Sequence, residues 1–202
     1  MALREQRRLE TQRAIQTHAV RLFAERGYDA TTVADVADAA GVSAMTVYRH
    51  FPTKEDLVLA DQHAADIAER IAASPPELPL VRRIGGALID GTAALTRDGR
   101  DKGLTPTGQF LLARLKLMIS TPALRAKHLD NNYVLQQAIV GALGYDASEP
   151  DKLFQAEAAA SACLAALHTA LVRWAEEDGR PDLPGLIGMA LAAAFGETVT
   201  GA

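Results

Sequence analysis

Residues 41–57 read Gly-Val-Ser-Ala-Met-Thr-Val-Tyr-Arg-His-Phe-Pro-Thr-Lys-Glu-Asp-Leu, and this stretch decides the fold. Gly41 can adopt the positive φ that a tight turn between two helices needs. Ser43 is a good N-cap for the helix that follows. Val47 and Phe51 lie four residues apart on that helix, so they can face inward together. The pattern predicts a short helix that buries one side and offers its polar side to a partner.

The preceding residues complete a small helical head around this turn. Gly27 follows an amphipathic segment with apolar residues at helical spacing, and it is well placed to end a helix. Thr31 or Thr32 can cap the next helix, whose first turn holds Asp35 near the positive end of the helix dipole. We therefore expect three helices over residues 9–26, 33–40 and 44–50. Two helices joined by a tight turn, the second with a polar face, indicate a helix-turn-helix DNA-binding domain over residues 1–60.

The rest of the chain also predicts helices, so we expect an all-α fold of about nine helices. Alanine and leucine are abundant, aromatic residues make up 5%, and no alternating run of β-branched residues reaches strand length. Thr53 can cap a fourth helix that runs to about residue 73 and leads into a second helical domain over residues 61–202. Further helices are expected over residues 80–97, 106–120, 122–143, 149–177 and 183–195.

Charge and composition exclude several kinds of protein. The net charge is −4, yet residues 1–56 are neutral and hold four arginines among their first thirteen residues. A single cysteine, Cys163, excludes an intrachain disulfide and a cysteine-based zinc site. The longest apolar stretches are shorter than the ~20 residues of a membrane span, and the charged N-terminus lacks a signal-peptide core. We expect a soluble cytoplasmic protein with no cofactor, no metal and no membrane partner.

Catalysis is not expected from this sequence. Cys163 and His168 are five residues apart, so on one helix they would point in directions about 140° apart, too far for a nucleophile–base pair. The sequence contains no phosphate-binding loop, no paired catalytic acids and no zinc-binding pair of histidines at helical spacing. We therefore expect no catalytic residues and interpret the chain as a protein other than an enzyme.

Five ordered motifs in the head resemble one known family. They are Phe-Ala-Glu-Arg-Gly-Tyr at 23–28, Thr-Thr-Val-Ala-Asp-Val-Ala at 31–37, Ala-Gly-Val-Ser at 40–43, Thr-Val-Tyr-Arg-His-Phe at 46–51 and Lys-Glu-Asp-Leu at 54–57. Together they resemble the DNA-binding domain of the TetR family of transcriptional repressors. The resemblance implies a homodimer whose two recognition helices enter the major groove of double-stranded DNA at an inverted-repeat operator. It also implies a small-molecule effector that releases the repressor.

The resemblance further implies which residues of the head contact DNA. Phosphate contacts are expected from Thr32, Thr46, Tyr48, His50 and Lys54. The side chains expected to face base edges are Ala44, Met45, Tyr48 and Arg49. Alanine and methionine offer apolar contact, best suited to a thymine methyl, whereas arginine either binds guanine bidentately or grips phosphate. Three alternatives stay open: Thr32 is only an N-cap, Tyr48 is a packing residue, and His50 is simply exposed.

The N-terminal arginines carry a separate expectation. Arg4, Arg7 and Arg8 precede the first expected helix. They form either an arm that reaches into a minor groove or a solvated, frayed end.

The resemblance gives the second domain two tasks, dimerisation and effector binding. Alanines crowd residues 149–177 and 183–195, which lets helices from two subunits approach closely, although alanine also simply favours helices. Candidate effector contacts are the larger or polar side chains on apolar helix faces, namely Phe110, Arg114, Met118, Tyr133, Gln137, Cys163, His168 and Trp174. The alternative is a ligand-independent DNA-binding or interaction protein that keeps the head and has no functional effector pocket.

Overall fold

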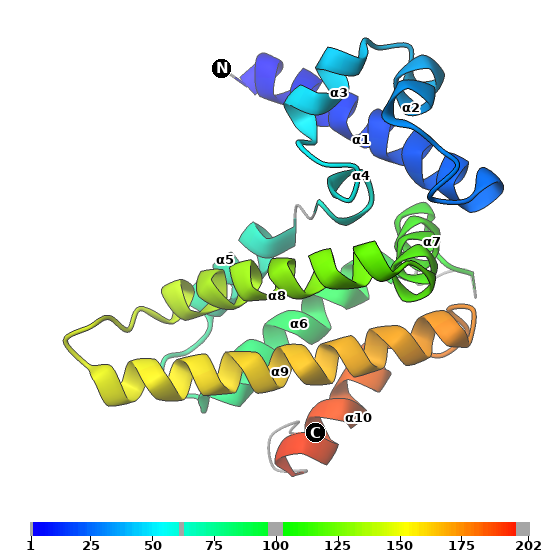
Figure 1. The fold of residues 1–202 in the computed structure, drawn as a ribbon. Helices are drawn as coiled ribbons and strands as arrows, with labels where there is room; N and C mark the ends of the chain where they lie inside the picture. Colours follow the sequence, from blue (N-terminus) through cyan, green and yellow to red (C-terminus); the bar gives the residue numbers. More distant parts are fainter. Residues whose placement is uncertain (1, 61–62, 97–102, 197–202) are drawn as a thin grey trace. The chain divides into compact units, whose positions relative to one another are not determined.

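The computed structural model describes residues 2–60, 63–96 and 103–196, and the regular elements within these ranges are all α-helices (Figure 1). The expected all-α class is therefore confirmed. The helices are α1 (Ala2–Arg26), α2 (Val33–Ala40), α3 (Ala44–His50), α4 (Asp56–Leu59), α5 (His63–Ala73), α6 (Leu80–Thr96), α7 (Pro106–Ser120), α8 (Pro122–Leu143), α9 (Pro150–Glu176) and α10 (Leu183–Phe195).

Two of the expected helix boundaries are wrong. The fourth expected helix is two helices, because Ala60 adopts a ψ of 117° and ends α4 at Leu59. The first helix begins at Ala2 rather than at residue 9, since the chain meets no helix breaker before Gly27. Residues 61–62 and 97, which two of the expected helices include, lie outside the described residues.

The chain forms two compact units. The first comprises residues 1–60 and 113–128, and the second comprises residues 61–112 and 129–202. We expected residues 113–128 in the second domain, but they pack with the head. Arg114 Nε donates a hydrogen bond to the Val58 carbonyl oxygen at 2.6 Å, and Lys127 Nζ lies 3.3 Å from Asp56 Oδ1. Side chains from distant parts of the chain therefore complete the first unit.

The core of the first unit holds the helices of the head in place. Apolar side chains of residues 2–60 are buried together, and those with relative exposures of 0–3% are Ile15, Ala19, Val20, Leu22, Phe23, Val36, Ala37, Val47, Phe51, Leu57 and Val58. These include the pair Val47 and Phe51 and most of the apolar stripe expected on the first helix, namely Ile15, Ala19, Leu22 and Phe23, whereas Ala14 of that stripe is exposed. The turn and the recognition helix thus rest on a continuous core.

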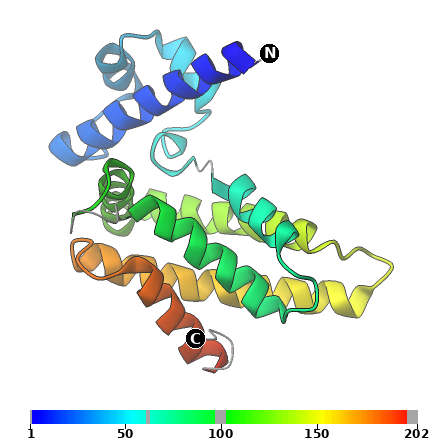
Figure 2. The same ribbon diagram turned by 180° about the vertical axis from the view of Figure 1, so that it is seen from behind.

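The second unit is built around α9, which packs against α6 and α10 (Figure 2). Gly85 on α6 permits a close approach, because a Cβ atom there would lie 2.9 Å from Leu191 Cδ1 on α10. Helix α9 is long and apolar enough to cross a membrane by length and composition alone. Its buried side chains, Cys163 and Trp174 among them, make it a core helix of this unit.

Candidate nucleic-acid interface

The turn between α2 and α3 has the geometry that its sequence predicts. Gly41 lies in the left-handed region at φ 66°, and the Val42 amide donates to the Ala37 carbonyl oxygen at 3.0 Å. Ser43 then caps α3, since its Oγ accepts a hydrogen bond from the Thr46 amide at 3.1 Å. These contacts satisfy polar groups at the end of one helix and at the start of the next. They determine the direction in which α3 leaves the turn.

Helix α3 buries one side and exposes the other. Val47 is fully buried, whereas Met45 is 78% exposed, Tyr48 is 50% exposed and Arg49 is also exposed. Large side chains exposed together on a helix of seven residues indicate a surface that binds a partner. An exposed surface with an arginine, a tyrosine and a methionine fits the major groove of DNA.

The other expected contacts of α3 flank this exposed surface. Ala44, Thr46 and His50 are each half-buried. Burial, followed by the positive charges of Arg49 and Arg8, lowers the pKa of His50 below its usual value. The imidazole is therefore neutral near pH 7 in the DNA-free protein.

Thr32 caps helix α2. Its Oγ1 accepts from the Asp35 amide at 3.1 Å and donates to Asp35 Oδ2 at 2.6 Å, while its own amide donates to the same carboxylate at 2.7 Å. These hydrogen bonds lower the pKa of Asp35 below its usual value. The N-cap role expected for Thr32 is thus present, whereas its phosphate contact stays a prediction.

Lys54 already has protein partners. Its Nζ donates to the Tyr28 carbonyl oxygen at 2.6 Å and lies 4.3 Å from the centroid of the Tyr28 ring. An ammonium group has three donors, so this hydrogen bond leaves two that can meet a phosphate. The aromatic ring holds the charge at the start of α4, where we expect the phosphate contact.

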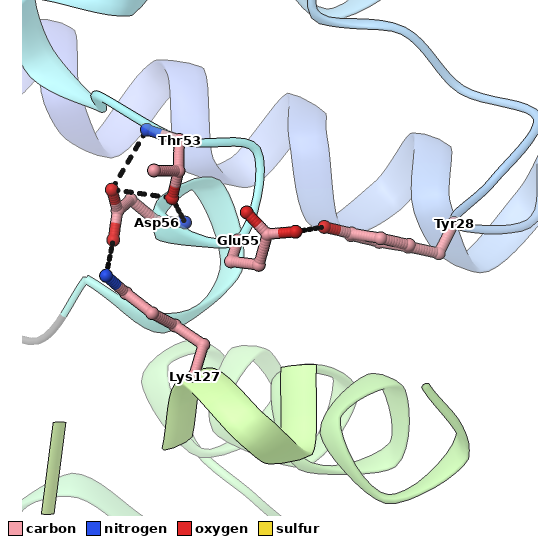
Figure 3. Close-up of polar contacts among 5 residues, drawn as sticks. All are labelled: Tyr28, Thr53, Glu55, Asp56 and Lys127. Carbon is pink, nitrogen blue, oxygen red and sulfur yellow. Dashed lines mark hydrogen bonds and ion pairs between the residues drawn. The ribbon is translucent and has the colours of Figure 1, made fainter. Parts of the chain in front are cut away.

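A polar network beside α4 fastens the head to more distant residues (Figure 3). Tyr28 Oη donates to Glu55 Oε1 at 2.9 Å, and burial together with the Glu55 carboxylate raises the pKa of Tyr28 above its usual range. Asp56 Oδ2 accepts from the Thr53 amide and hydroxyl at 3.0 and 2.8 Å, while Oδ1 faces Lys127. The role of Lys127 could not be predicted from the sequence, because no local pattern links it to Asp56.

The eight candidate effector residues do not form a single cluster within one unit. Arg114 and Met118 belong to the first unit, and the other six belong to the second. Met118, Cys163 and Trp174 are buried, whereas Tyr133 is 64% exposed. Gln137 is exposed, and Phe110 and His168 are half-buried.

Two of these side chains have structural partners. Arg114 binds the Val58 carbonyl oxygen, and Trp174 Nε1 donates to the Pro181 carbonyl oxygen at 3.1 Å. Their positions reflect helix packing, which a pattern of apolar faces does not reveal. Within residues 2–60, 63–96 and 103–196, no three acidic, histidine or cysteine side chains are grouped to hold a metal ion.

Two family models match the chain. Residues 15–60 match the model of bacterial regulatory proteins of the tetR family, and residues 106–195 match the MftR C-terminal domain. The HTH-type transcriptional regulator TcmR of Streptomyces glaucescens is 30% identical over 129 residues, which are 63% of this chain and 56% of TcmR. The matched region spans about half the length, or less, of the curated relatives that come first in this comparison.

Solved structures share the fold over nearly the whole chain. Native NalD, the secondary repressor of the MexAB-OprM multidrug efflux pump in Pseudomonas aeruginosa, has a TM-score of 0.58 at 20% identity, covering 94% of this chain and 97% of NalD. FadR of Thermus thermophilus, in complex with lauroyl-CoA, has a TM-score of 0.53 at 22% identity, covering 92% and 94% of the two chains. At these identities the likeness concerns the fold.

Proposed function

Because this chain belongs to the TetR family of bacterial regulatory proteins, we propose that it is a sequence-specific DNA-binding regulator, a repressor that a small molecule releases from its operator. The observation that supports this most directly is the two-sided character of α3. Val47 anchors the helix in the core, while Met45, Tyr48 and Arg49 are exposed and take no part in packing the core of the head. Their exposed surface is available to a partner. TcmR, which aligns with this chain over 129 residues, is itself a transcriptional regulator.

In this proposal the exposed side chains of the head divide the work of binding. Arg49 and Met45 read base edges in the major groove, with Met45 against a thymine methyl. Tyr48, His50 and Lys54 hold phosphates and set the register of α3 on the duplex. Thr46 and Thr32 lie at the starts of α3 and α2, where backbone N–H groups add to a phosphate contact.

Dimerisation in this proposal uses the exposed faces of α9 and α10. Phe154 is 70% exposed and Met189 is 60% exposed, and each lies on a helix face that also exposes alanines. Ala158 and Ala165 share the face of Phe154, because they follow it by four and eleven residues. Small side chains beside a large one suit helix-to-helix packing between two copies. A twofold dimer presents two copies of α3 to an inverted repeat.

Effector binding in this proposal takes place among the helices of the second unit. A ligand releases DNA only if it binds the DNA-free conformation more tightly than the DNA-bound one. FadR of Thermus thermophilus shares this fold and was solved with lauroyl-CoA, so acyl thioesters are a reasonable first class of compounds to test. The regulator acts in the cytoplasm, where it reaches DNA.

The test of the proposed function is selection of binding sites from a random duplex library with the purified protein. We expect an enriched inverted repeat, bound by a dimer with an affinity that falls steeply as salt rises. Arg49→Ala should relax the preference at one base pair of each half-site, and Tyr48→Ala should weaken binding to all sites. A folded protein that enriches no sequence would contradict the proposal.

A further inference from the structure

The N-terminal part of α1 projects beyond the core of the first unit. Ile15 is the first fully buried residue of the helix, and the preceding residues are exposed or half-buried wherever their side chains are described. Ala14 lies twelve positions after Ala2 along the helix, which corresponds to roughly 18 Å of length. Figures 1 and 2 show these turns extending past α2 and α4, on the side of the head that carries α3. None of the described side chains of this extension is fully buried.

Two arginines of the extension continue the buried stripe of α1. Arg8 precedes Ile15 by seven residues, so the two side chains leave the helix within about 20° of each other. Arg4 lies one turn further on the same face. The stripe that is apolar from Ile15 to Phe23 thus becomes basic where the protein no longer covers it, and both arginines are exposed.

Arg8 also lies in the electrostatic neighbourhood of α3. Its charge is one of the causes that lower the pKa of His50, the last residue of α3. The extension holds two acids: Glu5 precedes Arg8 by three residues, whereas Glu10 follows Arg8 by two residues and so points about 160° from it. Glu10 instead accepts a hydrogen bond from Gln6 at 3.2 Å.

We propose that Arg4 and Arg8 form a second DNA-contact surface, with which the helical extension of α1 binds the sugar-phosphate backbone beside the phosphates contacted by α3. This inference rests on the proposed function and adds a surface to it. The occupant is DNA because the face is basic, exposed and adjacent to the recognition helix, whereas the remainder of the chain after residue 56 carries all of the net negative charge. Phosphate contacts of this kind add affinity and register without reading sequence.

The test compares arginines that are removed from different faces of the same helix. Arg4→Ala and Arg8→Ala each remove one phosphate contact per subunit, and Arg13→Ala is the matched control because Arg13 points about 140° away from Arg8. Binding of the full-length protein to the duplex enriched by selection is measured as a function of salt. We expect each test variant to bind roughly tenfold more weakly near 0.1 M salt, with a salt slope lower by about two per dimer.

Two further measurements make the result specific. Arg8→Lys should keep the salt slope, because it keeps the charge, and circular dichroism should give the same helix content for all variants. Duplexes with single neutral methylphosphonate groups should identify the backbone positions that matter to the wild type and not to Arg8→Ala. We expect those positions to neighbour the ones lost in His50→Ala.

The outcomes separate this inference from the function on which it rests. If the wild type binds its site with a steep salt slope, and Arg4→Ala and Arg8→Ala behave as Arg13→Ala does, the second DNA-contact surface is refuted while the proposed function stands. If the wild type binds no duplex, the proposed function fails first.

Discussion

Asp56 uses both of its carboxylate oxygens for different purposes: Oδ2 accepts two hydrogen bonds from Thr53, and Oδ1 lies 3.3 Å from Nζ of Lys127 (Figure 3). The first interaction begins the turn that leads into α4. The second joins the head to a residue from the start of α8, within the same compact unit. One carboxylate thus links local helix capping to a contact between distant parts of the sequence.

This ion pair should stabilise the fold measurably, because its side chains are only 31% and 16% exposed. Lys127→Met should lower the free energy of unfolding by about 1 kcal/mol, with coupling of similar size to Asp56→Asn in a double-mutant cycle. Urea unfolding at low salt and at 1 M salt measures the free energy of unfolding of each variant, and the coupling energy should be smaller at high salt. Lys152→Met, which removes the more exposed pair with Glu149, is the control and should change stability much less.

The hydrogen bond from Tyr28 to Glu55 should make stability depend on pH. Burial by itself would raise the pKa of the Glu55 carboxyl, but hydrogen bonds from its own backbone, from Tyr28 and from Thr53 outweigh it and lower that pKa. The stabilisation is therefore complete above the ordinary carboxyl pKa of about 4.3 and is lost as the pH falls through the lower folded-state value.

Tyr28→Phe should accordingly cost about 1 kcal/mol at pH 7 and progressively less in acid. Urea unfolding at several pH values measures the difference. Tyr133→Phe alters a side chain that is 64% exposed and should leave the pH profile unchanged. A penalty for Tyr28→Phe that persists fully in acid would show that Glu55 is not the partner that matters.

DNA binding should become tighter as the pH falls from about 8 to about 6. The lowered pKa of His50 disfavours its charged form in the DNA-free protein, whereas a neighbouring phosphate favours that form. Binding then takes up a proton, so affinity rises as protons become available. Calorimetry in two buffers with different ionisation enthalpies counts the protons, and His50→Gln should abolish the uptake. Equal uptake in both proteins would exclude His50 as the titrating group.

Neighbouring glycines in α6 should respond oppositely to alanine. A Cβ atom at Gly86 would meet nothing within 4 Å, so Gly86→Ala should raise the free energy of unfolding by about 0.5–1 kcal/mol through helix propensity. At Gly85 the same atom would lie 2.9 Å from Leu191 Cδ1, so Gly85→Ala should be destabilising by about 1–3 kcal/mol. Fluorescence of Trp174, the one tryptophan, reports unfolding, because it is fully buried.

Cys163 should react with alkylating reagents only when the protein unfolds. Burial raises the pKa of its thiol to about 12, and the side chain has no exposed surface. In the folded state the thiol is therefore rarely ionised, and reagents cannot reach it. Mass spectrometry after timed exposure to iodoacetamide should detect modification in urea and almost none in native buffer. Rapid native labelling would show that α9 opens locally.

The head could be predicted well from sequence because its determinants are local. Gly41, Ser43 and Val47 each act within a few residues of their own position, so turn, cap and buried anchor follow from their spacing. The end of α4 at Leu59 could not be predicted, because alanine at position 60 favours a helix and gives no sign that the helix stops there. The pair of Asp56 and Lys127 depends on how distant helices pack, and no periodic pattern encodes it.

Candidate effector residues were harder to predict for the same reason. Trp174 and Tyr133 are both large amphipathic side chains on long helices, yet one is fully buried and the other is mostly exposed. The sequence pattern identifies a helix face, but the neighbours of that face decide whether a side chain supports the core or meets solvent.

Helix α1 is continuous from Ala2 to Arg26, so the number of residues before the core sets the direction in which the N-terminal side chains point around the helix axis. One residue inserted near Thr11 would leave the core untouched, yet it would turn Arg4 and Arg8 by about 100° around the helix axis. Seven inserted residues would nearly restore that direction and carry both charges about 10 Å farther from the core. Changes of length in this segment are therefore not equivalent to one another: near-multiples of a helical turn conserve its orientation, and other lengths redirect it.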